Sequence, residues 1–259
     1  KHQLYMIENL HNNKHIYTWG VKFSLLSVNE LVGAINSGIK NSQAPIHITG
    51  VNPETVVHAS RNETIRRAIL ESDFVNVDNA LIVLVLRVLG YKVPERAATP
   101  DLFEALLKLA SDERYKVFIL GAKESVLQTA IQHIKKDYPD LAIEGQDGYY
   151  PREKEAEIVE RIKLVAPDML FIALPSPEKE SFILKYKNEI RARLLLGVGG
   201  AIDCRAGVVK RPPQVLRNNG FEGIIRSLQN PLNYGKRYLT FYPAFFKIVI
   251  KSLFNKNNK

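Results

Sequence analysis

One carboxylate in this sequence has the position expected of a catalytic base. Asp78 directly follows a short predicted strand, Phe74–Val77, and precedes an apolar stretch that is predicted to be helical. A carboxylate at the end of a strand can accept the proton of a substrate hydroxyl as a general base. Aspartate is also favoured at the N-cap of a helix, so a purely structural role for Asp78 stays open at this point.

Glycines and arginines offer the complementary chemistry of anion binding. Gly197-Val198-Gly199-Gly200 follows another apolar run and would let a backbone approach a pyrophosphate closely, although it lacks the full dinucleotide-binding spacing. Glycine after a strand is also common in ordinary turns. Asp203 could accept a hydrogen bond from a ribose or a base, or cap the next turn. Guanidinium groups suit bidentate phosphate contacts, and the arginines that could make them, or lie solvated at the surface, are Arg96, Arg205, Arg211 and Arg226.

Several other kinds of site are disfavoured. The six histidines include no His-Glu-x-x-His spacing, and the one pair four residues apart, His11 and His15, lies close to the first residue, so we predict no zinc site. The sequence has no Gly-x-Ser-x-Gly elbow, no P-loop and no Asp-x-Asp pair for a divalent cation. Cys204 is the single cysteine, which excludes an intrachain disulfide and a paired-cysteine metal site. We therefore expect neither a metal nor a cofactor.

Short apolar runs that alternate with amphipathic stretches would position these residues. Strands are predicted over 45–49, 74–77, 115–120, 141–144, 169–174 and 194–198, and helices from 52, over 79–89, from 99, and over 123–136, 152–165 and 177–190. Strands that are apolar throughout and separated by helices indicate an α/β fold, a Rossmann-like and mostly parallel sheet with helices on both faces. We assign it to residues 1–205. Ligands bind outside the carboxyl ends of such strands, and the candidates that directly follow a predicted strand include Asn52, Asp78 and Gly199–Asp203.

The C-terminal fifth of the chain carries essentially all of the excess positive charge. Residues 205–259 contain eleven Lys and Arg against one acid, a formal charge of +10, whereas the whole chain carries +9, so the remainder sums to −1. Aromatic and aliphatic residues beyond Pro231 recur every three or four positions between cations, as in helices that lie in a membrane interface. The same helix could instead dock on the protein's own core, and Pro243 argues against one continuous helix. We predict a basic, aromatic helical appendage over residues 206–259.

The sequence also bears on compartment and partners. Residues 1–20 lack the apolar core of a secretion signal, and the longest apolar run, 80–86, is far below the roughly 20 residues that span a bilayer. We therefore expect a peripheral or freely dissolved protein. The single cysteine fits a reducing cytoplasm best, although a periplasmic protein without disulfides would look the same. A basic tail attracts phosphates, which could belong to nucleic acid, anionic lipid or a nucleotide.

A series of short motifs runs through residues 20–238 in a fixed order. They are Asn52-Pro53-Glu54; Asp78 at a helix start; Glu95-Arg96 with Asp101-Leu102; Phe118-Ile119-Leu120-Gly121; Tyr138-Pro139 with Gly148-Tyr149-Tyr150; Pro177 with Glu180; Gly197-Val198-Gly199-Gly200-Ala201-Ile202-Asp203 with Ala206-Gly207; Arg211-Pro212; and Gly220-Phe221-Glu222 with Arg226. In this order and spacing the sequence resembles the WecG/TagA/CpsF family of bacterial glycosyltransferases.

The resemblance implies metal-independent transfer with inversion, from a UDP-sugar to a polyprenyl-diphosphate-linked sugar, in surface polysaccharide or teichoic acid assembly. It implies that Asp78 is the catalytic base and that Asn52 positions a substrate. It further implies that the C-terminal appendage docks on an anionic membrane surface at the cytoplasmic face of the plasma membrane, with no nucleic acid partner and with homo-oligomer formation left open. The remaining residues that we expect around donor and acceptor are Arg96, Lys179, Glu180, Gly199, Gly200, Asp203, Arg211, Arg226 and Lys236.

The sequence departs from the family pattern at several of these positions. Asn79 and Thr99 stand where the family usually has glycine, Lys179 stands for glutamine, and Asn233 and Lys236 stand where arginine is usual. These departures indicate a different donor or acceptor, so the donor sugar is left open among N-acetylmannosamine, its uronic acid and glucose. They also motivate a second hypothesis, a non-catalytic relative that binds a nucleotide-sugar or serves as a scaffold at the membrane. A Rossmann NAD(P) or methyl-transfer enzyme is disfavoured by the incomplete glycine motif.

Overall fold

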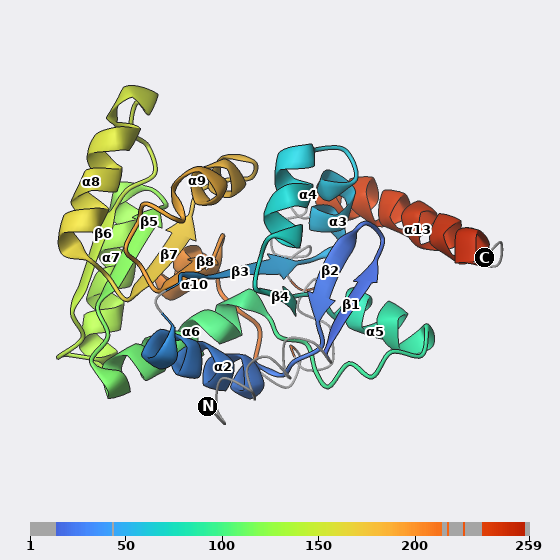
Figure 1. Cartoon of the computed structure of the whole chain (residues 1–259), viewed down its shortest axis with the longest axis horizontal. Helices are drawn as coiled ribbons and strands as arrows, with labels where there is room; N and C mark the ends of the chain where they lie inside the picture. Colours follow the sequence, from blue (N-terminus) through green and yellow to red (C-terminus); the bar gives the residue numbers. More distant parts are fainter. Residues whose placement is uncertain (1–13, 43, 214–216, 218–224, 226–234, 257–259) are drawn as a thin grey trace.

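A single sheet organises the chain. The computed structural model describes residues 14–256 except 43, 214–216, 218–224 and 226–234. Its eight strands lie in the order β1-β2-β4-β3-β8-β7-β5-β6 (Figure 1). Strand β1 pairs antiparallel with β2, and every other neighbouring pair in the sheet is parallel. The strands are β1 (His15–Thr18), β2 (Val21–Ser24), β3 (Ile46–Val51), β4 (Phe74–Val77), β5 (Val117–Gly121), β6 (Ile143–Gln146), β7 (Met169–Ala173) and β8 (Leu194–Gly197).

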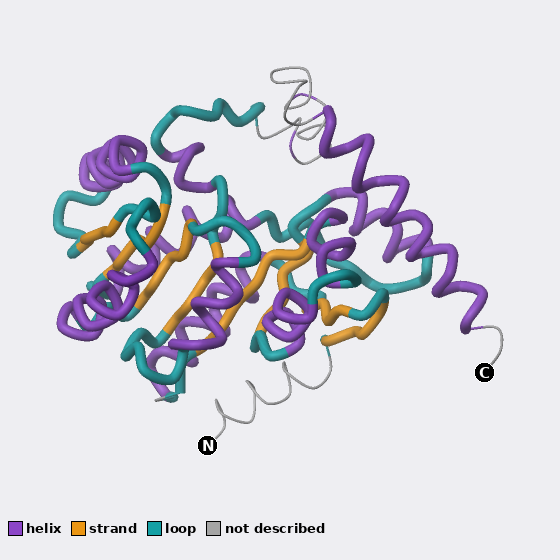
Figure 2. The backbone as a smooth tube through the Cα atoms, turned by 90° about the horizontal axis from the view of Figure 1, so that it is seen from above, coloured by secondary structure: helices purple, strands orange, loops and turns teal. Residues whose placement is uncertain are grey.

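Helices connect the parallel strands and cover the sheet on both sides (Figure 2). The helices are α2 (Val28–Asn41), α3 (Pro53–Ala59), α4 (Glu63–Leu70), α5 (Ala80–Val88), α6 (Thr99–Glu113), α7 (Glu124–Asp137), the short η1 (Arg152–Lys154), α8 (Glu155–Val165), α9 (Glu178–Tyr186), α10 (Ala201–Arg205) and α13 (Lys236–Lys256). This architecture confirms the predicted α/β fold class.

Successive residues of a strand pack into two different hydrophobic cores, one on each face of the sheet. In β5, Ile119 packs with α2, α6, α7 and α10, whereas its neighbour Phe118 packs with α8 and α9. The same alternation places Phe171 and Leu170 of β7 on opposite sides. Successive side chains of a strand point to opposite faces, so strands that are apolar throughout are buried on both faces.

The chain leaves two neighbouring strands in opposite directions. From β3 it enters α3, whose Val56 and Val57 join the core shared with α4, α5 and α13. From the adjacent β8 it enters α10, whose Ala201 and Ile202 join the core on the other face. A crevice between such diverging connections, at the carboxyl ends of the strands, is where open α/β sheets bind ligands. The sheet therefore points to the space beside β3 and β8 as the site.

All six predicted strands are present, with ends shifted by at most two residues. The sequence reading missed the β1–β2 hairpin and the helices α2 and α4. The hairpin turns at Trp19 and Gly20, whose φ angles of 56° and 76° match the left-handed turn that suits twisted strands. Tryptophan is an unusual residue for that conformation, so the turn carries no familiar sequence signal.

Helix α13 is continuous through Pro243, so the expectation that this proline breaks the helix is wrong. Proline removes the hydrogen bond to the carbonyl of Leu239, and that residue is highly exposed, where water can replace the lost donor. The inner side of the helix docks on the body: Phe245 is fully buried, and its ring meets Trp19 edge-on at 5.2 Å between centroids. No helix in the described part of the chain has the length and apolar content needed to cross a membrane.

The outer side of α13 remains apolar. Phe246, Ile250, Leu253 and Phe254 are exposed there, and Phe254 is 70% exposed. The sequence left open whether this helix docks on the protein's own core or presents an apolar surface outward. In the structure, one side of α13 docks on the core and the other side is apolar and exposed.

Candidate active site

Asp78 lies at the carboxyl end of β4 and is held by two backbone contacts. Its own N–H donates to the carbonyl of Val51 at 3.1 Å, which continues the pairing with β3. Its Oδ1 accepts from the N–H of Thr99 at 2.5 Å, and the side chain is half-buried. Asn79, not Asp78, caps α5, since its Oδ1 accepts from the N–H of Leu81 at 2.9 Å. Asp78 instead meets the first residue of α6, a helix that has no side-chain cap of its own.

The contact between Asp78 and Thr99 depends on close packing behind it. Asn76 is fully buried in β4, and its Nδ2 donates to the carbonyl of Ala97 at 2.7 Å and to Thr99 Oγ1 at 3.2 Å. A Cβ placed on Gly50 of β3 would lie 2.1 Å from Thr99 Oγ1. Gly50 therefore leaves the room that Thr99 occupies. The sequence analysis missed both Gly50 and Asn76, because only the pairing of β3 with β4 brings them together.

Asn52 directly follows β3, the strand that pairs with β4, and it has a clear structural role. Its Oδ1 accepts from the N–H of Thr55 at 3.0 Å and from Thr55 Oγ1 at 3.1 Å, so it caps α3. A side-chain amide also has two N–H donors in addition to this acceptor. The predicted role of Asn52 toward a substrate stays a prediction, and its position in the crevice is compatible with it.

The glycine turn after β8 provides open backbone. Gly199 has a φ of +48° and no heavy atom within 4 Å of where a Cβ would be, and Gly200 follows at the N-cap of α10. Both are exposed. Asp203 lies half-buried in α10, where burial raises the pKa of its carboxyl. The turn is therefore accessible to a ligand at the crevice edge.

Lys179 and Glu180 form a buried pair at the start of α9. The Nζ of Lys179 lies 3.1 Å from Glu180 Oε1, which also accepts from Ser176 Oγ at 2.8 Å. The Glu180 side chain is 3% exposed, and its Oε2 is buried without a hydrogen-bond partner in the described structure. A Cβ on Gly197 would lie 2.7 Å from Lys179 Cδ, so the lysine stem covers the end of β8. The structure thus brings this pair to the glycine turn.

Arginines gather around Asp101, in the first turn of α6. Asp101 Oδ1 accepts from Arg211 Nη1 at 2.7 Å and from Arg217 Nη1 at 2.6 Å, and Arg96 Nη2 lies 3.7 Å from Oδ2. Two residues earlier, Thr99 contacts Asp78. Arg96 and Arg211 were predicted site residues, whereas Arg217 was missed. Arg205, in contrast, does not contact Asp101 but pairs with Asp137 at 2.5 Å and with Glu104, one turn further along α6, at 3.4 Å.

Two predicted residues cannot be placed in the site. Arg226 lies outside the described residues, and Lys236 begins α13 with its side chain also outside them. Among the residues that are described, no group of three His, Cys, Asp or Glu side chains is arranged to hold a metal ion.

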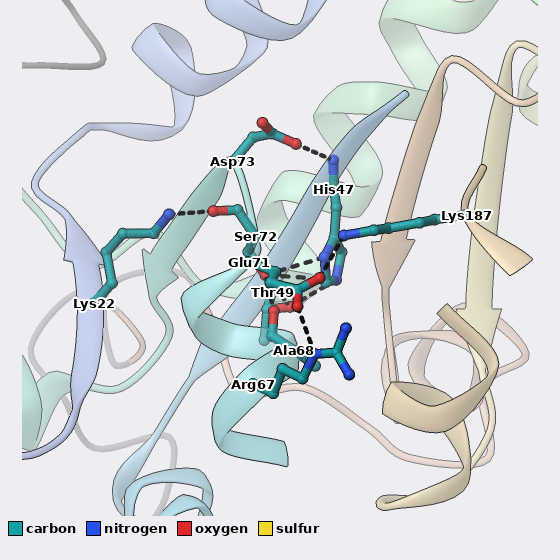
Figure 3. A network of polar contacts seen from close by, with 9 residues as sticks. All are labelled: Lys22, His47, Thr49, Arg67, Ala68, Glu71, Ser72, Asp73 and Lys187. Carbon is teal, nitrogen blue, oxygen red and sulfur yellow. Dashed lines mark hydrogen bonds and ion pairs between the residues drawn. The ribbon is translucent and has the colours of Figure 1, made fainter. Parts of the chain in front are cut away.

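A second polar cluster lies at the opposite edge of the sheet, where β3 and β4 begin (Figure 3). His47 is 2% exposed, its ring Nε2 lies 3.1 Å from Thr49 Oγ1, and its backbone N–H donates to Asp73 Oδ2 at 2.8 Å. Ser72 Oγ donates to Thr49 Oγ1 at 2.9 Å. Burial, helped by the charge of nearby lysines, lowers the pKa of His47 to about 3, so the ring is neutral. This cluster is a satisfied part of the core and lies away from the strand ends that bind ligands.

Comparisons with known proteins identify the family of this chain. The model of the glycosyl transferase WecG/TagA/CpsF family matches residues 16–259. The chain belongs to this family. A relative from Bacillus spizizenii, named N-acetylglucosaminyldiphosphoundecaprenol N-acetyl-beta-D-mannosaminyltransferase, is 32% identical over 79% of this chain and 78% of its own length. A protein of the same name from Staphylococcus aureus is 28% identical over 95% of this chain and 96% of its own length.

Membership in this family makes the chain a glycosyltransferase, an enzyme that joins a sugar to an acceptor hydroxyl. Such a reaction needs a group to accept the hydroxyl proton and positive charge to stabilise an anionic leaving group. Asp78 and the arginines beside α6 are groups of those two kinds, and the fold brings them to the same end of the sheet.

Proposed function

We propose that this protein transfers a sugar, with inversion and without a metal, from a UDP-sugar to a polyprenyl-diphosphate-linked sugar, with Asp78 as the base. The observation that carries the proposal is the half-buried Asp78 carboxylate, fixed by the Thr99 amide at the mouth of the sheet. A base that is already oriented loses little freedom when a substrate binds, which is one way in which enzymes lower a barrier.

The chemical step is a single displacement. The acceptor oxygen forms a bond to the anomeric carbon as the bond from that carbon to the donor diphosphate breaks, and the electron pair leaves with UDP. Asp78 takes the hydroxyl proton. Arg96 and Arg211, which already lie beside a carboxylate, can stabilise the negative charge that develops on the diphosphate. The glycine turn at Gly199 and the Lys179–Glu180 pair lie on the other side of the crevice, where the donor's sugar or nucleoside can be bound.

The substrates of the relatives suggest the first compounds to test. Their names describe transfer of N-acetylmannosamine to N-acetylglucosamine carried on undecaprenyl diphosphate. We propose the same acceptor class here. The donor needs a wider screen, because Lys179 adds a cation next to the glycine turn and could pair with a uronate carboxylate.

We also propose that residues 206–259 act as an appendage that holds the enzyme on the cytoplasmic face of the plasma membrane. The exposed apolar side of α13 carries Lys247 and Lys251, a combination that binds anionic lipid surfaces. A lipid-linked acceptor would then be presented from the same surface.

The deciding experiment supplies UDP-sugars together with a short-chain polyprenyl-diphosphate N-acetylglucosamine and measures UDP release and the mass of the lipid product. We expect release that depends on both substrates and persists in EDTA. Turnover that vanished in EDTA and returned with magnesium would contradict metal independence. Tight UDP-sugar binding without transfer to any lipid-linked acceptor would instead favour the non-catalytic scaffold.

A further inference from the structure

One carboxylate holds three guanidinium groups at the mouth of the site. The hydrogen bonds from Arg211 and Arg217 both end on Asp101 Oδ1, while Arg96 approaches Oδ2. All three arginine side chains are largely buried: those of Arg96 and Arg211 are 16% exposed, and that of Arg217 is 18% exposed. The four side chains carry a formal charge of +2, which is three positive charges less one negative.

The positive charge of the three arginines changes the pKa of the Asp101 carboxyl. Burial alone would raise the pKa of Asp101, but the hydrogen bond from Arg211 and the charges of Arg211, Arg217 and Arg96 outweigh burial and lower it. The carboxylate is therefore ionised near neutral pH. The neighbouring acid on α6, Glu104, contacts a different arginine, Arg205, at 3.4 Å.

The arginines have more hydrogen-bonding capacity than Asp101 can use. Each guanidinium has five N–H donors, whereas one carboxylate accepts about four hydrogen bonds in all. The Nε of Arg217 is buried without a hydrogen-bond partner in the described structure. Buried donors without acceptors are costly, and an added anion with several oxygens would satisfy them.

Asp101 also ties two distant parts of the chain together. It lies in the first turn of α6, two residues after the Thr99 amide that fixes Asp78. Arg211 and Arg217 come from the segment that follows α10, more than one hundred positions further along the chain. The carboxylate therefore holds the Arg211 and Arg217 side chains at the start of α6, near the residue that contacts the base.

We propose that Asp101 is a positioning residue that holds Arg211 and Arg217 beside Arg96 so that the three together bind a diphosphate group. This inference rests on the proposed function, in which both the donor and the acceptor contain a diphosphate. Without the carboxylate, three like charges would repel one another and separate. With Asp101 in place, the three arginines are already held together in the free enzyme, so substrate binding does not have to overcome their repulsion. The four side chains keep a net charge of +2, which matches a dianionic ligand.

The test compares Asp101→Asn with Asp101→Glu and with Asp112→Asn, a matched change at the exposed far end of α6. Calorimetry measures the affinity for UDP and, separately, for a short-chain polyprenyl diphosphate, and steady-state kinetics separates KM from kcat. We expect Asp101→Asn to weaken binding of one of the two diphosphates about tenfold or more. If that diphosphate is the donor's, kcat at saturation should fall as well, because the arginines also stabilise the charge that develops on the leaving group, whereas kcat should change far less if it is the acceptor's. Asp101→Glu should recover most of the affinity, and Asp112→Asn should match the wild type. The ligand whose affinity falls identifies the diphosphate that is held.

A double-mutant cycle with Arg217→Gln supplies a second measurement. If Asp101 acts through the arginines, the effects of Asp101→Asn and Arg217→Gln on diphosphate affinity should be strongly non-additive. Unchanged affinity for both diphosphates in Asp101→Asn, with a wild type that transfers sugar, would overturn the positioning role alone. A wild type that transfers no sugar would refute the proposed function, while the binding comparison would still decide the role of Asp101. If Asp101→Asn fails to fold, Arg217→Gln alone decides, and unchanged affinity in that variant overturns the proposal.

Discussion

Replacing Asp78 with asparagine isolates its chemistry from its structural contact. The asparagine Oδ1 can still accept from the Thr99 amide, which Asp78 does at 2.5 Å, so the link to α6 is kept. The change converts a charge-assisted hydrogen bond into a neutral one, which costs about 1 kcal/mol of stability. The fold should therefore remain intact, because Asn79 still caps α5 and the backbone pairing with Val51 does not involve the side chain.

The expected loss in turnover is much larger than this effect on stability. An amide cannot take the proton from the acceptor hydroxyl, and general-base catalysis contributes roughly a hundredfold to ten-thousandfold. That range corresponds to about 3–5 kcal/mol added to the barrier of the chemical step. KM should change little, since neither the arginines around Asp101 nor the glycine turn is altered.

The same strand offers a matched control. Asp73, at the other end of β4, accepts from the His47 amide at 2.8 Å, so Asp73→Asn makes an identical chemical change to a carboxylate that holds a backbone N–H. Product formation should be followed by mass spectrometry of the lipid under conditions saturating in both substrates. We expect kcat to fall by at least a hundredfold for Asp78→Asn and to stay within about twofold for Asp73→Asn. Equal kcat values for the two variants would refute the assignment of Asp78 as the base.

Other parts of the structure give further expectations. His47 has an ordinary pKa of 6.5 and a folded-state pKa of about 3, so only the unfolded chain gains its proton between these values. The free energy of unfolding, measured with urea, should therefore fall by about 1.4 kcal/mol per pH unit as pH drops below about 6. A His47→Gln variant whose free energy of unfolding fell just as steeply with pH would show that His47 is not the cause. Gly50→Ala should push Thr99 away from the base and lower kcat at least tenfold, because the added Cβ would lie 2.1 Å from Thr99 Oγ1. Adding Thr99→Gly should restore kcat, and failure to do so would assign the loss to another cause. On α13, Phe245→Ala should cost about 3–5 kcal/mol of stability, whereas Phe254→Ser should leave stability nearly unchanged but reduce sedimentation with anionic vesicles. The reverse pattern would contradict the two-sided role of that helix.

The sequence was most informative about residues whose place in the fold depends only on the strand that they follow. Apolar runs such as 169–174 predicted buried parallel strands, and the rule that ligands bind beyond their carboxyl ends selected Asp78, Asn52 and the turn at Gly199 correctly as residues of one edge. These predictions need only local pattern and a general property of parallel sheets.

The parts that were missed depend on contacts between distant segments. The partner of Asp78 is a backbone amide at Thr99, and a backbone amide has no sequence signature. Arg217 gains its role from Asp101, 116 positions away, and looked like any other basic residue of the tail. In α13, Phe245 and Phe246 are neighbours of the same type, yet one is fully buried and the other is 41% exposed, because only the first faces Trp19.

A structure of the protein with a bound UDP-sugar tests the central claim most directly. The account predicts that the donor diphosphate or its sugar lies in the crevice beside β3 and β8, with room for an acceptor hydroxyl about 3 Å from a carboxylate oxygen of Asp78. A donor bound at the other edge of the sheet, near His47, or with its anomeric carbon turned away from Asp78, would contradict the account.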